Sequence, residues 1–177
     1  MISGSSIARS VARAWNWTLN GGPTGSQQLT PAIGAVLRMI KMMGIFYFSS
    51  ELTEPWGREL PPMDDCLWFH VVISGSCTIA VDQGPSMTVR AGDLVLVPQG
   101  SGHRAWGAER APTQSVLDLP HEYLSDDYAV LRHGGGGDRT DIVCGGVRFD
   151  HPTARHLVGE LPGLIHIDSA RTPRFVG

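Results

Sequence analysis

Short runs of β-branched and aromatic residues, interrupted by turn-forming residues, dominate the chain from residue 44 onward. These runs occupy residues 44–52, 66–81, 86–98, 103–106, 140–150 and 164–167. The sequences EPWG, SGS, DQGP, QGSG and GGGG that break them are rich in Gly, Pro, Asp and Ser, which favour tight turns. Strands this short and this closely spaced predict a mainly β fold, an antiparallel sandwich or small barrel.

Two segments show helical patterning instead. In residues 31–43 the apolar side chains recur at helical spacing, Pro31 suits the first turn, and Gly44 is placed to end the helix. Residues 151–162 predict a second, short helix with its apolar residues on one side. Residues 111–127 are expected to form a polar connection between the two groups of strands.

Length and composition fit one domain. The 177 residues are 42% hydrophobic, which is enough for a core, and the formal net charge of −3 gives no general attraction to nucleic acid or to an anionic membrane. No window reaches the roughly 20 apolar residues of a membrane span. The cysteines are widely spaced without a CxxC pair, so we expect free, buried thiols in a reducing cytoplasm: Cys66, Cys77 and Cys144.

The N-terminal segment has a different composition from the rest. Residues 1–29 contain Gly, Ser, Thr and Gln with two arginines and no acidic residue. This composition predicts a disordered or poorly ordered extension, and a transit peptide is the alternative.

One motif makes the barrel prediction specific. Residues 92–103, GDLVLVPQGSGH, resemble the second cupin motif, in which glycine, five residues, Pro-x-Gly, two residues and histidine follow one another. Gly92, Pro98, Gly100 and His103 are all in register, and Gly107 stands where that motif ends in Asn. The resemblance implies a cupin-like antiparallel β-barrel, a double-stranded β-helix, with an N-terminal helix and a short C-terminal helix.

The first cupin motif indicates whether a cupin binds a metal ion, because it carries most of the metal ligands. In metal-binding cupins it supplies two histidines and one glutamate ahead of a strand-end glycine, which here corresponds to Gly75. Counted back from that glycine, the glutamate position falls on Trp68 and the histidine positions fall near Pro62 and Asp64. No metal or other cofactor is therefore expected. The alternative is a divalent transition metal held by His70 and His103 with help from Asp64 or Cys77.

The wider pattern resembles the N-terminal cupin domain of bacterial AraC-type transcription regulators. The stretches that carry this resemblance are PWG, WFHVV, GDLVLVP, GGGG and CGGVRFD, within residues 30–168. It implies a sensor domain that binds a small organic effector and forms a homodimer. Residues 169–177 would be a linker-like tail, and the helix-turn-helix DNA-binding domain of such regulators is absent from this chain, so no DNA binding by the chain alone is expected.

An interior ligand site is expected from aromatic and imidazole side chains on these strands. Strand alternation puts Trp68 and His70 on one face, and tryptophan and histidine together suit a small organic ligand with one or two polar groups. The expected ligand-binding residues are Trp68, His70, Val72, Cys77, His103 and Trp106.

Three other interpretations stay open at this stage. Trp68 could fill the barrel and leave no cavity, in which case the domain would only dimerise. The chain could instead be a stand-alone cupin enzyme, a metal-dependent dioxygenase or isomerase with a degenerate metal site, or a metal-free one with His70 and His103 as acid and base. No catalytic residue is assigned, because no Ser-His-Asp order, GxSxG, P-loop or GxGxxG sequence is present.

Overall fold

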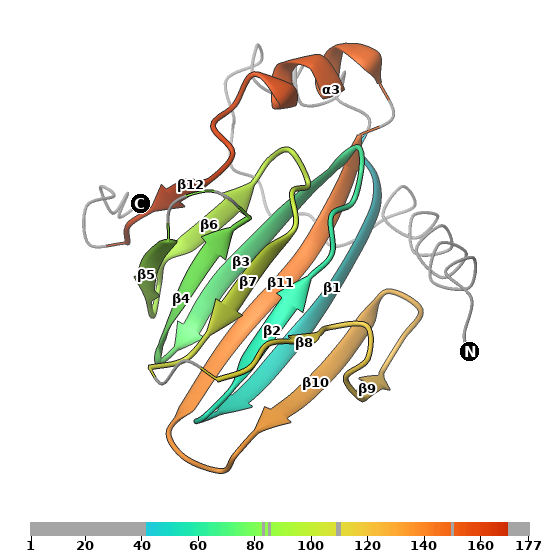
Figure 1. Ribbon diagram of the computed structural model, residues 1–177. Coiled ribbons are helices and arrows are strands. Elements are labelled where there is room, and N and C mark those ends of the chain that lie inside the picture. The colour runs from blue at the N-terminus through green and yellow to red at the C-terminus, as the bar shows by residue number, and fades with distance from the viewer. Residues whose placement is uncertain (1–41, 83, 85, 109–110, 150, 170–177) are drawn as a thin grey trace, which may run out of the picture.

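The computed structural model describes residues 42–169, except residues 83, 85, 109–110 and 150. Within these residues the chain forms two β-sheets and one helix, α3 (Pro152–Gly159) (Figure 1). The seven-stranded sheet has the order β12 (Ile165–Ile167), β6 (Leu94–Val97), β3 (Cys66–Ser74), β11 (Arg139–Phe149), β1 (Met42–Thr53), β10 (Tyr128–Gly134) and β9 (His121–Tyr123). The five-stranded sheet has the order β5 (Ser86–Arg90), β4 (Ser76–Val81), β7 (His103–Trp106), β2 (Gly57–Leu60) and β8 (Gln114–Ser115).

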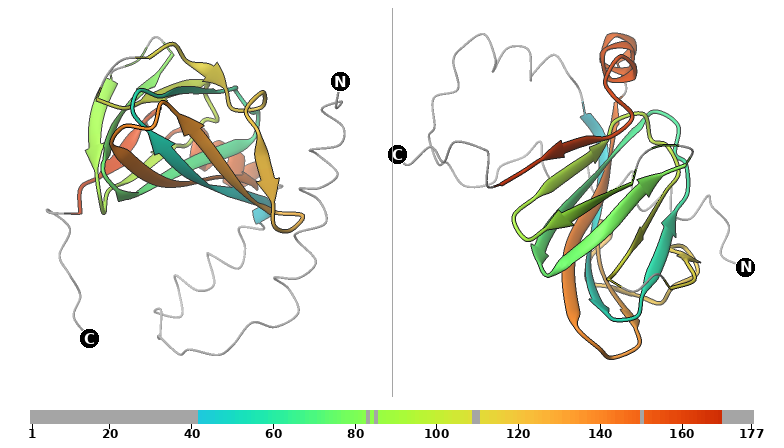
Figure 2. Two further views of the ribbon diagram at one scale, coloured as in Figure 1. Left: turned by 90° about the horizontal axis from the view of Figure 1, so that it is seen from below. Right: turned by 60° about the vertical axis from the view of Figure 1, so that its left-hand side comes forward.

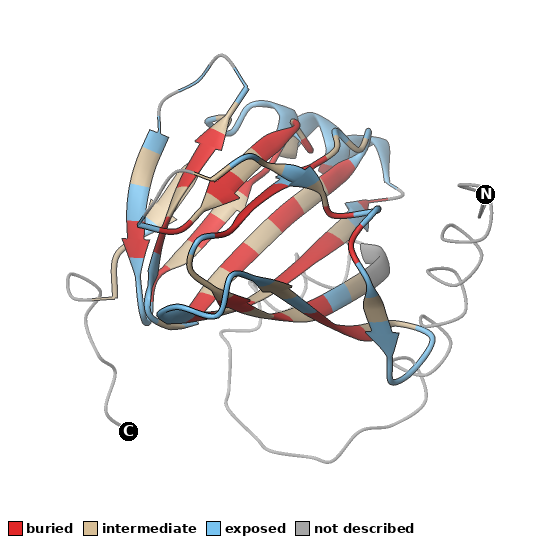
Figure 3. Ribbon diagram, turned by 60° about the horizontal axis from the view of Figure 1, so that its bottom comes forward, coloured by how far each residue is buried: buried red, intermediate tan, exposed pale blue. Residues whose placement is uncertain are grey.

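The two sheets face each other and enclose one apolar interior (Figure 2). Inward and outward residues alternate along the strands because successive side chains of a strand point to opposite faces, which produces the banding of Figure 3. On β3, for example, Trp68, His70 and Val72 are buried while Phe69 and Val71 between them are only half-buried. Side chains of both sheets therefore meet in the same interior, as the mainly β prediction requires.

The sheets do not close into the predicted antiparallel barrel. In the part of the chain that is described, no strand pairing joins one sheet to the other. The pairs β1–β10 and β2–β8 are parallel, so both sheets are mixed. Three of the four edge strands, β8, β9 and β12, have only two or three residues and leave few backbone groups for further pairing.

Several element boundaries differ from the sequence-based expectations. Residues 31–41 of the first predicted helix lie outside the described residues. For the last two residues of that helix the prediction is wrong, because Met42 and Met43 belong to the strand β1. Their backbone joins the ladder with β11, where Met42 pairs with Phe149, and this pairing overrides the helical spacing. Strands β2 and β10 were not expected, and the connection at 111–127 contains the short strands β8 and β9.

The glycines of the 92–103 motif hold backbone shapes that other residues rarely adopt. Gly92 has φ of 92° and Gly100 has φ of 65°. A Cβ on Gly100 would also lie 2.0 Å from the carbonyl oxygen of Met63. Gly100 therefore allows the turn after β6 to pack against the chain that leads into β3, and this turn delivers His103 to the start of β7.

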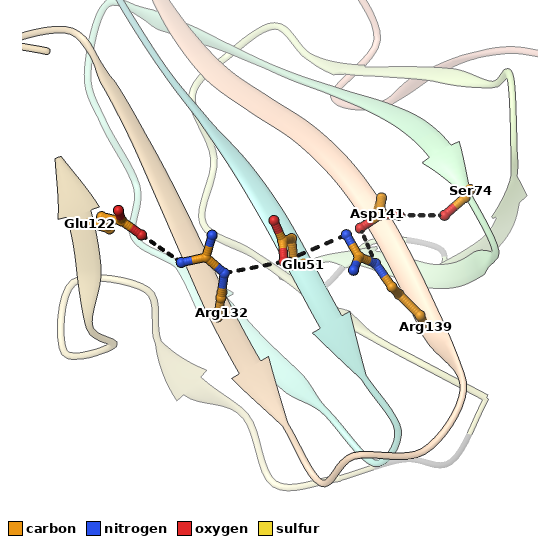
Figure 4. Close-up of polar contacts among 6 residues, drawn as sticks. All are labelled: Glu51, Ser74, Glu122, Arg132, Arg139 and Asp141. Carbon is orange, nitrogen blue, oxygen red and sulfur yellow. Dashed lines mark hydrogen bonds and ion pairs between the residues drawn. The ribbon is translucent and has the colours of Figure 1, made fainter. Parts of the chain in front are cut away.

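The outer face of the seven-stranded sheet carries a ladder of alternating charges (Figure 4). Arg132 on β10 contacts Glu122 on β9 at 2.5 Å and Glu51 on β1 at 3.2 Å. Arg139 on β11 bridges Glu51 and Asp141 at 3.5 and 2.8 Å. Exposed pairs of this kind contribute little stability, but they mark this face as one that contacts water. The opposite face of the same sheet points into the interior, where most of the expected ligand-binding residues lie.

Helix α3 lies at one end of the molecule, beyond both sheets (Figure 1). His151 caps its first turn, where the imidazole accepts a hydrogen bond from the Thr153 N–H at 3.2 Å. Of its residues only Ala154 is buried, and Leu157 is 56% exposed. The helix is too short to cross a bilayer, and none of the described residues forms a helix that is long and apolar enough to do so.

Candidate ligand-binding site

The structure brings five of the six expected site residues into the space between the sheets. They come from three strands and each is at most 2% exposed: Trp68, His70, Val72, Cys77 and His103. Trp106 does not join them. It is half-buried on β7 at an odd offset from His103, so it faces the outside together with Arg104.

His70 and His103 form the centre of the interior cluster. Their Nε2 atoms lie 2.7 Å apart, although His70 comes from the seven-stranded sheet and His103 from the five-stranded one. His103 Nδ1 lies 2.9 Å from the carbonyl oxygen of Ser101. A carbonyl only accepts, so His103 Nδ1 carries the proton and its Nε2 is an acceptor. His70 Nε2–H must then donate to His103, which leaves His70 Nδ1 as an acceptor.

The hydrogen-bond chain continues from His70 to a buried arginine. The Cys144 thiol on β11 lies 3.0 Å from His70 Nδ1 and donates to it, since that nitrogen carries no proton. Cys144 Sγ in turn accepts from Arg58 Nη2 at 2.9 Å, and Arg58 Nη1 donates to Ser50 Oγ at 2.6 Å. Arg58, at 0% exposure on β2, thus begins a directed chain that crosses the interior and ends at the Ser101 carbonyl.

Burial keeps the two imidazoles and the thiol of this hydrogen-bond chain neutral. Desolvation, the adjacent His103 and then the Arg58 charge lower the pKa of His70 well below its usual value. Desolvation also lowers the pKa of His103 to about 4, with a contribution from Arg58 in the same direction. Burial raises the pKa of the Cys144 thiol, although Arg58 and Ser50 oppose the shift. At neutral pH both imidazoles and the thiol are therefore uncharged.

Aromatic and apolar side chains surround the polar chain. Trp68 packs edge-on against His103, with ring centroids 5.8 Å apart, and against Phe46 at 5.4 Å. The Arg58 guanidinium lies over the Phe48 ring, 5.7 Å from its centroid. A polar chain inside apolar walls is typical of sites that orient a small molecule through a few directed hydrogen bonds.

Two pockets on the outside of the sheets are separate from this cluster. One, of about 210 Å³, is lined by Arg104, Trp106 and residues 111–113. The other, of about 180 Å³, lies between α3 and the chain around Cys66 and Pro98. Neither His70 nor His103 lines either of these two pockets.

The sequence of the chain matches one known protein family over most of its length. The model of that family, described as Cupin, matches residues 32–176. The chain belongs to the cupin family. This match confirms the predicted relationship to the cupin domains that AraC-type regulators carry.

Two solved structures are similar to this cupin domain at low sequence identity. The protein YhaK from Escherichia coli is 10% identical with a TM-score of 0.42, and the match covers 87% of this chain and 53% of that one. The unsaturated fatty acid-bound ToxT from Vibrio cholerae strain SCE256 is 11% identical with a TM-score of 0.40, covering 72% of this chain and 41% of that one. The chain spans about half the length of YhaK and two fifths of ToxT. None of the curated proteins matches the chain.

The cupin family raises the question of a metal, and the residues present do not fit one. Trp68 occupies the position of the missing glutamate ligand. Of the two further ligands of the alternative prediction, Asp64 is exposed, and Cys77 is buried as a protonated thiol because burial raises its pKa to about 12. Within residues 42–169, apart from the five that are not described, no three His, Cys, Asp or Glu side chains gather to hold an ion. The two imidazole nitrogens that meet in this cupin domain are instead joined by one hydrogen bond.

Sequence reasoning missed three members of the cluster. Arg58, Cys144 and Ser50 were not among the expected site residues, yet all three are 0% exposed. Arg58 follows the sequence EPWG, which predicts a turn, whereas β2 already begins at Gly57. The usable signal was the alternation itself: Arg58 lies between Trp56 and Leu60 at even offsets, so one arginine shares the inward face of two large apolar residues.

Proposed function

We propose that this cupin domain is the small-molecule effector-binding and dimerisation domain of an AraC-type transcription regulator. The observation that supports this most directly is the polar chain from Arg58 to His103 inside an otherwise apolar interior. Buried polar networks are costly to assemble, and this one joins side chains of β1, β2, β3, β7 and β11. In the cytoplasm, where such regulators act, the three free thiols would stay reduced.

The same series of interior hydrogen bonds offers a way to convert ligand binding into a change of the domain. The hydrogen bond between His70 and His103 is a direct polar link between the two sheets. A ligand that replaces this bond would change the spacing of the sheets and favour one of two arrangements of the domain. The effect on a partner would be a population shift, limited by the difference in ligand affinity between those arrangements.

The dimer contact is proposed to involve α3. This helix exposes Leu157 at 56% and is followed by Leu161 at 39% exposure, so its apolar stripe is not covered by the sheets. Exposed apolar stripes of this kind mark contact surfaces. Light scattering coupled to size exclusion should give twice the monomer mass for the full chain and the monomer mass for Leu157→Asp. A dimer that survives Leu157→Asp unchanged would place the contact elsewhere.

Binding is tested by thermal shift with a library of small organic compounds on the full chain. A true effector raises the melting temperature with ligand concentration as mass action requires. The response should be lost in Trp68→Leu, which alters the interior, and kept in His156→Gln, which alters an exposed residue of α3. A compound that stabilises both variants equally binds outside the interior and contradicts the proposal. Mass spectrometry of the incubated compound would reveal turnover and favour an enzyme instead.

A further inference from the structure

Arg58 is a buried cation without an acidic partner. Its side chain is fully buried on β2, and none of the ion pairs formed by the described residues includes it. An isolated charge in an apolar interior is expensive, and arginine does not lose its proton to reduce that cost. A fold that retains such a charge needs a compensating group.

The neighbouring acids and thiols do not supply that group. Glu54 accepts the Ala108 N–H through Oε1, and its Oε2 is buried without a hydrogen-bond partner, but no ion pair among the described residues joins it to Arg58. Asp82 pairs with Arg104 at 3.6 Å. The two thiols nearest Arg58 stay protonated, because burial raises the pKa of Cys77 to about 12 and also raises that of Cys144. Among the described residues, Arg58 therefore has no carboxylate in ion-pair contact.

Hydrogen-bond donors are also left over beside this charge. Arg58 Nη1 and Nη2 donate to Ser50 and Cys144, but its Nε–H has no partner among the described residues. The indole N–H of Trp68, which packs on His103, has none either, and the same holds for Trp56, two residues before Arg58. Unpartnered N–H donors beside a guanidinium without an ion pair suit the same complement, a group that only accepts and carries negative charge.

The single positive charge of Arg58 and the apolar side chains around it indicate which class of anion would fit. One guanidinium in an interior of Trp, Phe, Val and Ile balances a single negative charge, whereas a phosphate dianion would leave a net charge buried. A carboxylate matches the planar fork of arginine and can engage Nε–H together with one terminal N–H. The apolar walls suit an apolar body attached to it.

We infer that the effector is a small organic monocarboxylate with an apolar body, whose carboxylate binds Arg58 between the two sheets. This inference rests on the proposed effector-binding function and adds the chemical class of the ligand. Arg58 then acts as the charge anchor, Trp68 and Phe48 form the walls, and the His70–His103 bond is the contact that the ligand displaces or bends.

The test compares carboxylates with their neutral amides on the full chain. Straight-chain acids from acetate to decanoate, and benzoate, are titrated at pH 7.5 and constant ionic strength beside the corresponding amides, with melting temperature as the first readout. The acids that fit are expected to stabilise the wild type and Arg132→Met, a matched control on the exposed ladder. Affinity should fall about tenfold or more in Arg58→Met and for each amide.

A second readout does not depend on the stability of the variant. The Arg58 Nε–H gives its own signal in a ¹H–¹⁵N spectrum, and a buried Nε–H exchanges slowly enough to be followed in the wild type. It should shift with acid and not with amide. The inference is overturned if amides bind as tightly as acids, if Arg58→Met folds and keeps the response, or if no acid in the series moves the signal. The proposed function fails separately, only if the wider library of neutral compounds also gives no interior binding.

Discussion

Acidification should unfold this protein through its two interior imidazoles. Burial keeps His70 and His103 neutral in the fold, and the pKa of His103 falls from 6.5 to about 4. In the unfolded chain both titrate near 6.5, so below that pH only the unfolded state gains their protons. Stability is therefore complete above about pH 6.5 and declines as the pH falls toward 4.

The size of the effect follows from the number of protons. Each histidine that is charged only when unfolded lowers the free energy of unfolding by about 1.4 kcal/mol per pH unit, so two give about 2.7. His103 alone accounts for about 3 kcal/mol over its whole shift. Between pH 6.5 and 4.5 His103 removes about 2 kcal/mol, a sizeable part of the total stability of many domains. His70, whose pKa is also held well below its usual value, adds to this loss in the same direction.

Urea titrations followed by tryptophan fluorescence measure this dependence directly. The free energy of unfolding at half-unit steps from pH 7.5 to 5 gives the slope. In His103→Gln, where an amide keeps one donor and one acceptor, the slope should fall by about half. In His156→Gln, an exposed site, it should not change. A free energy that stays flat between pH 6.5 and 5, or an unchanged slope in His103→Gln, would refute the neutral, hydrogen-bonded pair.

Other parts of the structure give further expectations. Gly100→Ala forces a side chain into a left-handed position against Met63 and should cost several kcal/mol in a denaturation curve, whereas Gly159→Ala, with open space around it, should stay within about 1 kcal/mol of the wild type. Asp93 is held ionised by N–H donors and His166 that outweigh its burial and lower its pKa to about 2, so Asp93→Asn should lower the melting temperature at pH 7. Ellman's reagent should react slowly with the native protein at pH 8 and with three thiols after denaturation, because burial protects Cys66, Cys77 and Cys144.

The sequence predicted well those features of the fold that are determined by residues close together along the chain. The run from Gly92 to His103 specified a strand, a turn and the start of the next strand, and the structure has β6, the turn at Gly100 and β7 there. The alternation on β3 correctly placed Trp68 and His70 on the inward face. Such features follow from the two-residue period of a strand and from the backbone freedom of glycine.

The composition of the site was harder to predict from the sequence, because the residues that contact one another there are far apart along the chain. Cys144 and His70 are separated by 74 residues, and only the strand register of β11 against β3 brings them together. Arg58 lies directly after the predicted turn EPWG, in a strand of only four residues that the sequence patterns did not indicate. Trp106 was the opposite case: its odd offset from His103 already put it on the outer face, so the alternation rule would have excluded it from the interior.

The fixed direction of the interior hydrogen bonds limits how this protein can diverge. Every donor from Arg58 to His103 points the same way because the chain ends on a carbonyl oxygen that can only accept. Replacing one member reverses or removes the proton that the next member needs, so the cost of a second replacement depends on the first. Related chains that have lost one of the two imidazoles should therefore have exchanged the other imidazole and the thiol as well.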